Sequence, residues 1–319
     1  MTEALIRPLR ADHRPGGIPI VAAPPTTEAP LWVSAHRDAL LAEVRDTGAV
    51  LIRGLGVAGP EAAADVTRAV LGEPMTEREP FVPRPRLPGG LYPSTPWPAD
   101  QPMCMHHELS YGTEMPALLA FTCLTAPATG GATALADAAA VLRDLPDALV
   151  ARFAGGWELR RTYNELIGVS WQEAFGTGDR AEVERWCAGQ AITARWTAGG
   201  LHTRRVRPAV RQHPDTGEAL WCNQIAFLNE WTMDPAVRSY LIAEFGPDGL
   251  PFTTLDGDGR ALDRATVDVI NEVYARHTVR EPWQSGDVLL VDNIRMAHSR
   301  EPYTGDRVVL AALGAPTIL

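Results

Sequence analysis

Apolar residues follow two different spacings along this chain, and each spacing predicts its own kind of element. Helical spacing begins at Pro30, passes through Leu40 and Val44, and predicts a helix that ends at about Arg45. The same spacing predicts helices over residues 59–71, 180–189, 233–245 and 262–276, and a short helix that begins at Asp137. The last long helix has Asp263 as its expected N-cap, because a carboxylate there can accept free backbone N–H groups.

Short continuous apolar runs predict buried strands. The run over residues 49–52 closes at Gly54, and similar runs predict strands over residues 118–124, 157–163, 219–223, 288–291 and 308–313. The proline-rich stretch from Glu79 to Pro102 is expected to form an ordered loop with one or two strands. No repeat or linker marks a boundary. The pattern therefore predicts one domain over residues 1–319, mainly β with surrounding helices, and an irregular arm over residues 1–30.

The composition narrows the class of protein without choosing a function. Hydrophobic residues make up 45% and charged residues 21% of the 319 residues, which is ordinary for a globular chain. The net charge of −10 argues against a nucleic-acid or anionic-membrane partner, since both favour basic proteins. The four cysteines are widely spaced, which indicates reduced thiols. No signal-peptide pattern and no apolar run of ~20 residues is visible, so we expect a cytoplasmic protein.

The densest chemical motif is His106-His107-Glu108. If this segment is a strand, His106 and Glu108 point to one face and His107 to the other. One imidazole and one carboxylate on a common face are two thirds of a 2-His-1-carboxylate iron site, which leaves positions open for co-substrates. The expected third ligand is His298, which follows a predicted buried strand. A jelly-roll barrel places early and late strands side by side, so the long separation in sequence is no obstacle.

An isolated His-x-Glu pattern is weak evidence, because it arises by chance in many proteins. His107 competes with His106 but has no carboxylate on its own face. A non-catalytic metal- or ligand-binding jelly-roll sensor and a zinc hydrolase with the same three ligands are therefore alternatives. Asp292, Asn293 or a backbone carbonyl is expected to orient His298 from behind.

A second candidate element is Arg307, which lies downstream of His298 on the last predicted strand. A 2-oxoglutarate site needs a fixed cation for the distal carboxylate, and arginine is the bidentate choice. The hydroxyl of Thr133 is a candidate partner for the same carboxylate. The alternative for Arg307 is a surface ion pair with its neighbour Asp306.

Several short motifs follow one another in a characteristic order between residues 45 and 315. They cover residues 48–54, 92–95, 106–111, 130–137, 170–175, 213–218, 223–224, 283–287, 298–300 and 305–307. Together they resemble the TauD/TfdA family of Fe(II)- and 2-oxoglutarate-dependent dioxygenases. The closer likeness is to the clavaminate-synthase-like branch, which includes syringomycin-type aspartyl hydroxylases. The resemblance implies a double-stranded β-helix, or jelly roll, with His106, Glu108 and His298 on the metal. It implies that Arg307 and Thr133 bind 2-oxoglutarate, with O2 as the second co-substrate.

The resemblance also implies a class of reaction. Halogenases of the superfamily have a small residue in place of the carboxylate ligand. Glu108 is present, so hydroxylation is expected, with desaturation, epoxidation or cyclisation as alternatives. The expected substrate is an amino acid or a derivative, free or tethered to a carrier protein, in specialised metabolism such as antibiotic biosynthesis. Four residues are candidates for substrate contact, and for each of them core packing or a solvated position is an equal alternative. They are Asn223, Gln224, Trp171 and Arg161.

The chain departs from the branch at three positions. The branch often has asparagine where His107 stands, arginine where His202 stands and phenylalanine where Cys222 stands. The last two differences fall near the expected substrate side, so they bear on the identity of the substrate.

Overall fold

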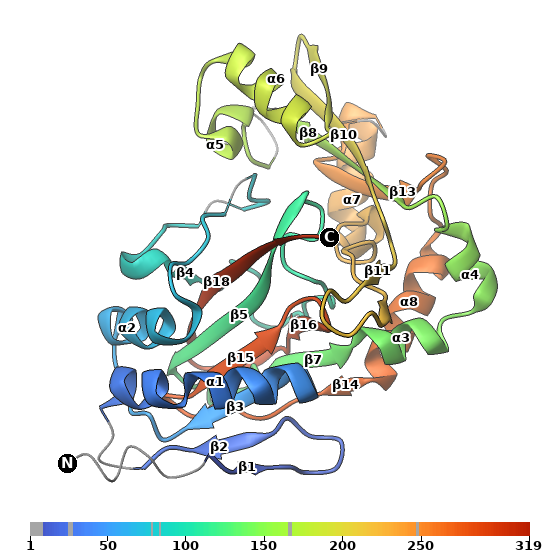
Figure 1. Ribbon diagram of the computed structural model, residues 1–319. Coiled ribbons are helices and arrows are strands. Elements are labelled where there is room, and N and C mark those ends of the chain that lie inside the picture. The colour runs from blue at the N-terminus through green and yellow to red at the C-terminus, as the bar shows by residue number, and fades with distance from the viewer. Residues whose placement is uncertain (1–8, 25–27, 78, 83, 165–167, 247–248) are drawn as a thin grey trace.

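The computed structural model describes residues 9–24, 28–77, 79–82, 84–164, 168–246 and 249–319. Its centre is a seven-stranded sheet, the main sheet, in which every neighbouring pair is antiparallel except β2 and β3 (Figure 1). In spatial order the strands are β1 (Ala11–Asp12), β2 (Ile20–Ala22), β3 (Ala49–Arg53), β15 (Val288–Asp292), β5 (Glu114–Thr125), β18 (Val308–Ile318) and β4 (Tyr92–Pro93). Strands from the start, middle and end of the chain therefore lie side by side.

The main sheet buries both of its faces, as the continuous apolar runs predict. Along β3, Val50 and Ile52 face one way and pack with helices α1 (Ala29–Thr47) and α2 (Pro60–Leu71). Their neighbours Ala49 and Leu51 belong to the core on the other side. The two-residue period of the strand thus divides the sheet between two hydrophobic clusters.

A glycine lets α1 end close to the second sheet. Gly48 follows α1 with a φ of 85° and donates its N–H to the carbonyl of Val44. A Cβ on Gly48 would lie 2.5 Å from the sulfur of Met296, so a side chain has no room there. Glycine is the residue that tolerates both the positive φ and the close approach.

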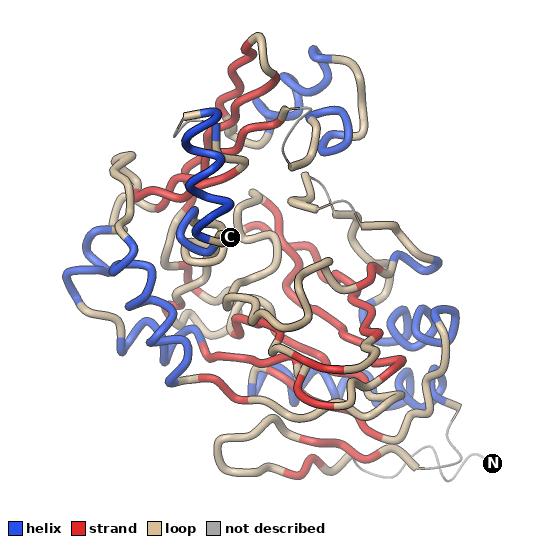
Figure 2. Tube along the Cα trace, turned by 180° about the vertical axis from the view of Figure 1, so that it is seen from behind, coloured by secondary structure: helices blue, strands red, loops and turns tan. Residues whose placement is uncertain are grey.

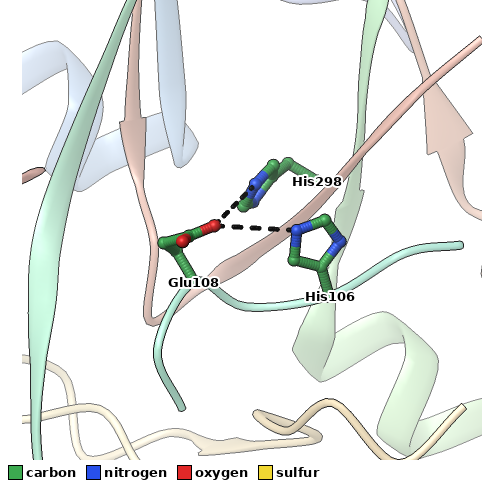
Figure 3. A group of neighbouring side chains, drawn as sticks. All are labelled: His106, Glu108 and His298. Carbon is green, nitrogen blue, oxygen red and sulfur yellow. Dashed lines mark ion pairs between the residues drawn. The ribbon is translucent and has the colours of Figure 1, made fainter. Parts of the chain in front are cut away.

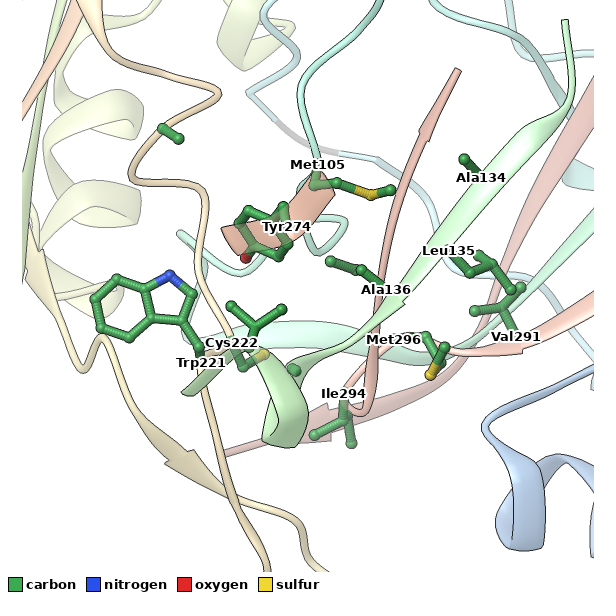
Figure 4. Packing of buried hydrophobic residues seen from close by; sticks show 14 of the residues in the cluster. Met105, Ala134, Leu135, Ala136, Trp221, Cys222, Tyr274, Val291, Ile294 and Met296 are labelled. Carbon is green, nitrogen blue, oxygen red and sulfur yellow. The ribbon is translucent and has the colours of Figure 1, made fainter. Parts of the chain in front are cut away.

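The second sheet has three strands and shares the inner core with the main sheet. Its order is β14 (Thr278–Val279), β7 (Thr133–Asp137) and β16 (Met296–Arg300). Figure 4 shows Leu135 of β7 and Met296 of β16 beside Val291 of the main sheet. Helices α3 (Ala138–Asp144) and α8 (Arg264–Arg276) contribute to the same cluster, while α4 (Asp147–Arg152) follows α3.

A four-stranded sheet lies at the top of Figure 1, away from α1 and α2. Its order is β13 (Phe252–Asp256), β8 (Trp157–Tyr163), β10 (Gly200–Arg207) and β9 (Thr193–Thr197). Helices α5 (Trp171–Phe175) and α6 (Arg180–Gly189) share a separate hydrophobic cluster with it. Helix α7 (Pro235–Phe245) lies beside this sheet in both views (Figures 1 and 2).

The remaining elements are short. They are the pairs β6 (Thr129–Gly130) with β17 (Tyr303–Thr304) and β11 (Arg211–Gln212) with β12 (Ala219–Leu220), and the 3-10 turns η2 (Pro88–Gly90) and η3 (Glu230–Thr232). None of the helices in the described ranges is both long and apolar enough to cross a membrane.

Most of the elements that the sequence predicts are present. Asp263 caps α8 and Asp137 caps α3 through their carboxylates, as expected. The expected strand over residues 219–223 is only Ala219–Leu220. The expectation of an irregular arm over residues 1–30 needs correction within the described residues. There β2 pairs with β3 and β1 pairs with β2, because the buried Ile20 and Val21 extend the apolar edge of the main sheet.

Candidate metal centre and its two cavities

The structure brings the segments around His106 and His298 into direct backbone contact. The N–H of His106 donates to the carbonyl of His298 at 3.0 Å, and the reverse bond is 2.9 Å long. His106 therefore adds one residue to the edge of β16. Glu108 lies in the turn that follows, so the expectation of a regular strand over residues 106–108 is wrong. The turn nevertheless returns the carboxylate to the side that both histidines face (Figure 3).

The three side chains form a compact donor set. Oε2 of Glu108 lies 3.7 Å from Nε2 of His106 and 3.7 Å from Nε2 of His298. One donor atom from each residue fits within a group that spans at most 4.8 Å. Metal bonds to nitrogen and oxygen are about 2.0–2.2 Å long, so a single divalent ion can reach all three. Two imidazoles and one carboxylate are the donors of a facial iron site.

The protonation of these groups suits a metal. Nδ1 of His106 lies 2.9 Å from the carbonyl of Cys104 and donates to it, so Nε2 is the nitrogen that faces the carboxylate of Glu108. Burial, and next to it His106, hold the pKa of His298 well below its usual value, so this ring is neutral. Burial opposes ionisation of Glu108, but His106 and Arg84 outweigh it and lower its pKa to about 2. The site therefore offers the neutral imidazole of His298, Nε2 of His106 and one carboxylate.

Asn293 holds the turn that carries Glu108. Its Oδ1 accepts the N–H of Glu108 at 2.8 Å, and its Nδ2 donates to the carbonyls of Glu108 and Pro116. The carbonyl of Asn293 also lies 2.7 Å from Nδ1 of His107, which is fully buried and turned away from the donor set. Asn293 was expected to orient His298, but it holds Glu108 instead.

Asp292 does not contact His298 either. Its Oδ2 lies 2.9 Å from Nε2 of His213, and its Oδ1 accepts the N–H groups of Ile294 and Arg295. Asp292 therefore stabilises the connection between β15 and β16. Nδ1 of His298 is buried and has no hydrogen-bond partner within the described ranges.

Two cavities meet at the donor set. The first, called the Arg307 cavity, is lined by Arg84, Ser94, Thr95, Met103, His106, Glu108, Leu119, Phe121, Thr133, His298, Ser299, Arg300, Arg307, Ala311 and Leu313. Arg307 donates to the carbonyl of Gly131 at 2.8 Å and to the hydroxyl of Ser94 at 3.2 Å. It forms no ion pair with any described residue, Asp306 included. Burial, and next to it the like charge of Arg300, lower the pKa of Arg307 to about 10.

A largely buried guanidinium without an ion-pair partner favours an anionic ligand. Thr133 is buried on β7 in the wall of the same cavity. The structure therefore brings together all five residues that the sequence predicts for the metal and the co-substrate. Ser94 was missed as a contact of Arg307, although it lies in one of the family-like motifs.

The second cavity, called the aromatic cavity, adjoins the first at the donor set. It is lined by Glu77, Phe81, Val82, Arg84, Thr95, Trp97, His106, Glu108, Tyr111, Gln224, Phe227, Leu228 and Phe252. The ring of Phe227 stacks on that of His106, with centroids 4.3 Å apart. The two cavities share Arg84, Thr95, His106 and Glu108, so a ligand in either one lies next to the metal position.

The charged groups of the aromatic cavity were not predicted from the sequence. Arg84 contacts Glu77 at 2.9 Å and the carboxylate of Glu108 at 3.4 Å. Burial raises the pKa of Glu77 to about 7, against the opposing effect of Arg84. The available signal was the group of charged residues at the start of the proline-rich stretch, because an ordered loop buries few charges without a reason.

Only one of the four residues predicted to contact substrate lines the aromatic cavity. This is Gln224, whose Nε2 donates to the carbonyl of His107 at 2.6 Å. Asn223 bonds the backbone of Ala209 and Ile225. The other two lie beyond the cavity wall: Trp171 packs edge-on against Trp196, and Arg161 donates to the carbonyls of Glu79 and Pro80.

Comparison with known proteins agrees with this arrangement. Residues 12–313 match the family described as Taurine catabolism dioxygenase TauD, TfdA family. The Dapdiamide synthesis protein DdaC of Enterobacter agglomerans is 32% identical over 273 residues, covering 85% of this chain and 83% of that protein.

Two solved structures share the fold. The PvcB protein from Pseudomonas aeruginosa superposes with a TM-score of 0.57 at 14% identity, over 97% of this chain and 91% of that one. An asparagine oxygenase, solved with Fe(II), 3-hydroxyasparagine and succinate, superposes with a TM-score of 0.50 at 16% identity, over 91% and 85% of the two chains. The expected jelly-roll fold is confirmed.

Proposed function

Because the chain belongs to the TauD/TfdA family and is an Fe(II)- and 2-oxoglutarate-dependent oxygenase, we propose that it hydroxylates an amino acid or an amino-acid derivative. The observation that carries the proposal is the position of His106, Glu108 and His298 where two cavities meet. In the proposal these three residues hold the iron. Bound Fe(II) supplies the redox chemistry that couples oxidative decarboxylation of 2-oxoglutarate by O2 to oxidation of the substrate.

The Arg307 cavity is the proposed 2-oxoglutarate site. Arg307 binds the distal carboxylate of the co-substrate, and the hydroxyl of Thr133 donates to the same group. Burial disfavours the positive charge of Arg307 and lowers its pKa, and a carboxylate at this position compensates that charge. Ser94 and the carbonyl of Gly131 keep the guanidinium in one orientation, so little freedom is lost when the co-substrate binds.

The aromatic cavity is the proposed substrate site. Its rings exclude water from the part of the donor set that they line, and Phe227 stacks on His106. The asparagine oxygenase supports an amino-acid substrate, and the relative named for dapdiamide synthesis supports a role in specialised metabolism. Hydroxylation is the proposed outcome, and desaturation, epoxidation or cyclisation are its alternatives. The proposal leaves open whether the substrate is free or tethered to a carrier protein, and it includes a cytoplasmic location and a single domain over residues 1–319.

An anaerobic optical titration tests the proposal. The Fe(II)-loaded protein is titrated with 2-oxoglutarate, and the weak visible charge-transfer band of the chelate is recorded for wild type and for Arg307→Ala. Loss of a charge-assisted bond in a closed site costs about 2–5 kcal/mol, so the variant should need roughly 30- to 4000-fold more co-substrate. The matched control is Arg280→Ala, since Arg280 is exposed and pairs with Glu301.

The two outcomes separate the hypotheses. A band in wild type that weakens only in Arg307→Ala supports both the metal ligands and the co-substrate site. A folded, iron-loaded wild type without any band would contradict the assignment of the site.

A further inference from the structure

Glu77 and Arg84 form a buried ion pair in the wall of the aromatic cavity. Nη2 and Nε of Arg84 lie 2.9 Å and 3.2 Å from Oε2 of Glu77, and the two side chains are only 7% and 9% exposed. The other side chains of this wall are mostly rings and aliphatic groups. Removing two charges from water costs free energy that the pair itself often fails to recover. Such a pair is therefore poorly explained by stability alone.

Each member of the pair keeps one atom without a partner. Nη2 of Arg84 also contacts Oε1 of Glu108, but Nη1 has no hydrogen-bond partner among the residues that the structure describes. Oε1 of Glu77 likewise has none there, since Arg84 binds Oε2. Both residues line the aromatic cavity. A cationic donor and an anionic acceptor are thus available to the same ligand.

Gln224 adds a third available atom. Its Nε2 donates to the carbonyl of His107 at 2.6 Å, and this bond fixes the orientation of the amide. Oε1 is left without a hydrogen-bond partner within the described ranges, in a residue that also lines the cavity. The polar surface of the cavity therefore offers one positive donor and two acceptors, one of them negative.

We propose that Glu77, Arg84 and Gln224 bind the head group of a free α-amino acid. The carboxylate of the ligand pairs with Nη1 of Arg84, and its ammonium group with Oε1 of Glu77 and Oε1 of Gln224. The side chain of the ligand then lies among Phe81, Phe227 and Phe252. The inference rests on the proposed function, and it chooses the free amino acid over a carrier-tethered one.

The choice follows from the chemistry of the tether. An aminoacyl thioester has no free α-carboxylate, so it would leave the free donor of Arg84 buried and unpaired. The cavity volume of about 100 Å³ lies well below the roughly 300–1,000 Å³ of sites for drug-sized ligands. A compact zwitterion suits both the charge and the size of this space.

Arg84 also provides a way to detect the ligand. The same guanidinium touches the carboxylate of Glu108, so pairing with a ligand carboxylate changes the surroundings of a proposed metal ligand. The optical band of the Fe(II)–2-oxoglutarate complex should therefore shift when the amino acid binds.

The experiment titrates that anaerobic complex with each of the twenty proteinogenic L-amino acids. Dissociation constants are read from the band shift and, independently, by calorimetry. An amino acid that binds is then compared with its methyl ester and its N-acetyl derivative. We expect each derivative to bind roughly 10- to 100-fold more weakly, because each removes one charge-assisted bond.

Variants test the protein side of the same bonds. Glu77→Gln keeps the shape and should weaken binding of the free amino acid by roughly 10- to 100-fold. It should leave the 2-oxoglutarate band in place, because Glu77 does not line the Arg307 cavity. Arg86→Met is the matched control, since Arg86 lies in the same loop but is exposed.

The outcomes distinguish this inference from the proposed function. If the 2-oxoglutarate band forms but the methyl ester binds as well as the free amino acid, the inference is overturned and the proposed function stands. The same holds if none of the twenty amino acids gives a band shift or a heat of binding. If wild type gives no 2-oxoglutarate band at all, both fail together.

Discussion

The two cavities meet at the same three side chains but are built from different material. Strands supply most of the wall of the Arg307 cavity: Leu119 and Phe121 on β5, Thr133 on β7, and Ala311 and Leu313 on β18. Loops supply most of the wall of the aromatic cavity, and the loop residues in it are Glu77, Phe81, Val82, Arg84, Thr95, Trp97, Gln224, Phe227 and Leu228. Paired strands hold their side chains in fixed positions, whereas loops vary most easily between relatives.

The difference matches the chemistry that each cavity is proposed to serve. The co-substrate is the same throughout the family, so its site benefits from the rigid sheets. The substrate differs between members, so its site can change without disturbing the sheets. The rigid strands thus form the site for the reaction that the family shares, and the adaptable loops form the site that sets the specificity of each member.

His298→Ala tests the element that both cavities need, and it has the largest expected effect. Only two protein ligands remain, so we expect no stoichiometric Fe(II) binding and no 2-oxoglutarate band. Metal analysis and the optical titration measure the two losses. His277→Ala is the control, because its ring bonds Asp144. Stoichiometric iron in His298→Ala would show that the ion is held elsewhere.

Arg205→Met tests the ion pair that holds the loop wall of the aromatic cavity in place. Both terminal nitrogens of Arg205 bind the carboxylate of Glu79, at 2.9 Å and 2.5 Å, and Glu79 is almost fully buried. This pair fastens the loop before Arg84 to β10. Removing one partner of a buried pair costs about 3–5 kcal/mol of unfolding free energy.

Chemical denaturation measures that loss, with Arg195→Met on the neighbouring strand as control, since Arg195 is exposed. In the variant we expect amino-acid affinity to fall more than 2-oxoglutarate affinity, because this loop contributes Glu77, Phe81 and Val82 to the aromatic cavity alone and only Arg84 to both cavities. Equal losses in the two affinities would contradict the division between strands and loops.

Asn293→Ala tests the boundary between the cavities, with a smaller expected effect. The variant loses three hydrogen bonds that hold the turn of Glu108. Removing a group that orients a metal ligand lowers metal affinity by about 10- to 100-fold. Competition with a chelator measures the change. Asn229→Ala is the control, because this buried asparagine bonds Thr254 instead, and equal Fe(II) affinity in both variants would refute the role.

The strand-walled half of the site could be predicted from the sequence. Continuous apolar runs predict the late strands, and the resemblance to the TauD/TfdA family points to His298 and Arg307 beside them. The jelly roll then explains why His106 meets His298. The local geometry was missed, because the turn at Glu108 depends on Asn293, which no periodicity connects to it.

The loop-walled half could not be predicted in the same way. The loop with Glu77 and Arg84 has no period, so nothing indicates which of its charges turn inward. Arg161 and Trp171 show the opposite error, because both were predicted to contact substrate. Arg161 instead bonds to a backbone carbonyl and Trp171 packs against Trp196, both beyond the cavity wall. Contacts made by loops depend on the whole fold and not on local spacing.

The pH dependence of the unfolding free energy tests the ion pair of the loop wall once more. Of the changes predicted here, this one is expected to be the smallest. Burial alone would raise the pKa of Glu79, but the guanidinium of Arg205 outweighs it, and the pKa lies below its ordinary value of 4.5. A carboxyl with a depressed pKa in the folded state stabilises that state fully above its unfolded pKa. The stabilisation is lost as the pH falls through the folded pKa.

Glu79→Gln keeps the shape of the side chain but cannot ionise, so it isolates this contribution. The unfolding free energy of wild type should exceed that of the variant at pH 7, and the gap should narrow below about pH 4.5. Urea titrations at several pH values between 7 and 3 measure the gap. A gap of constant size would mean that Glu79 fastens the loop through neutral hydrogen bonds, such as the one from Tyr163, and not through its charge. A narrowing gap would show that the loop side of the site depends on one ion pair, a dependence that the hydrogen-bonded strands around Arg307 do not share.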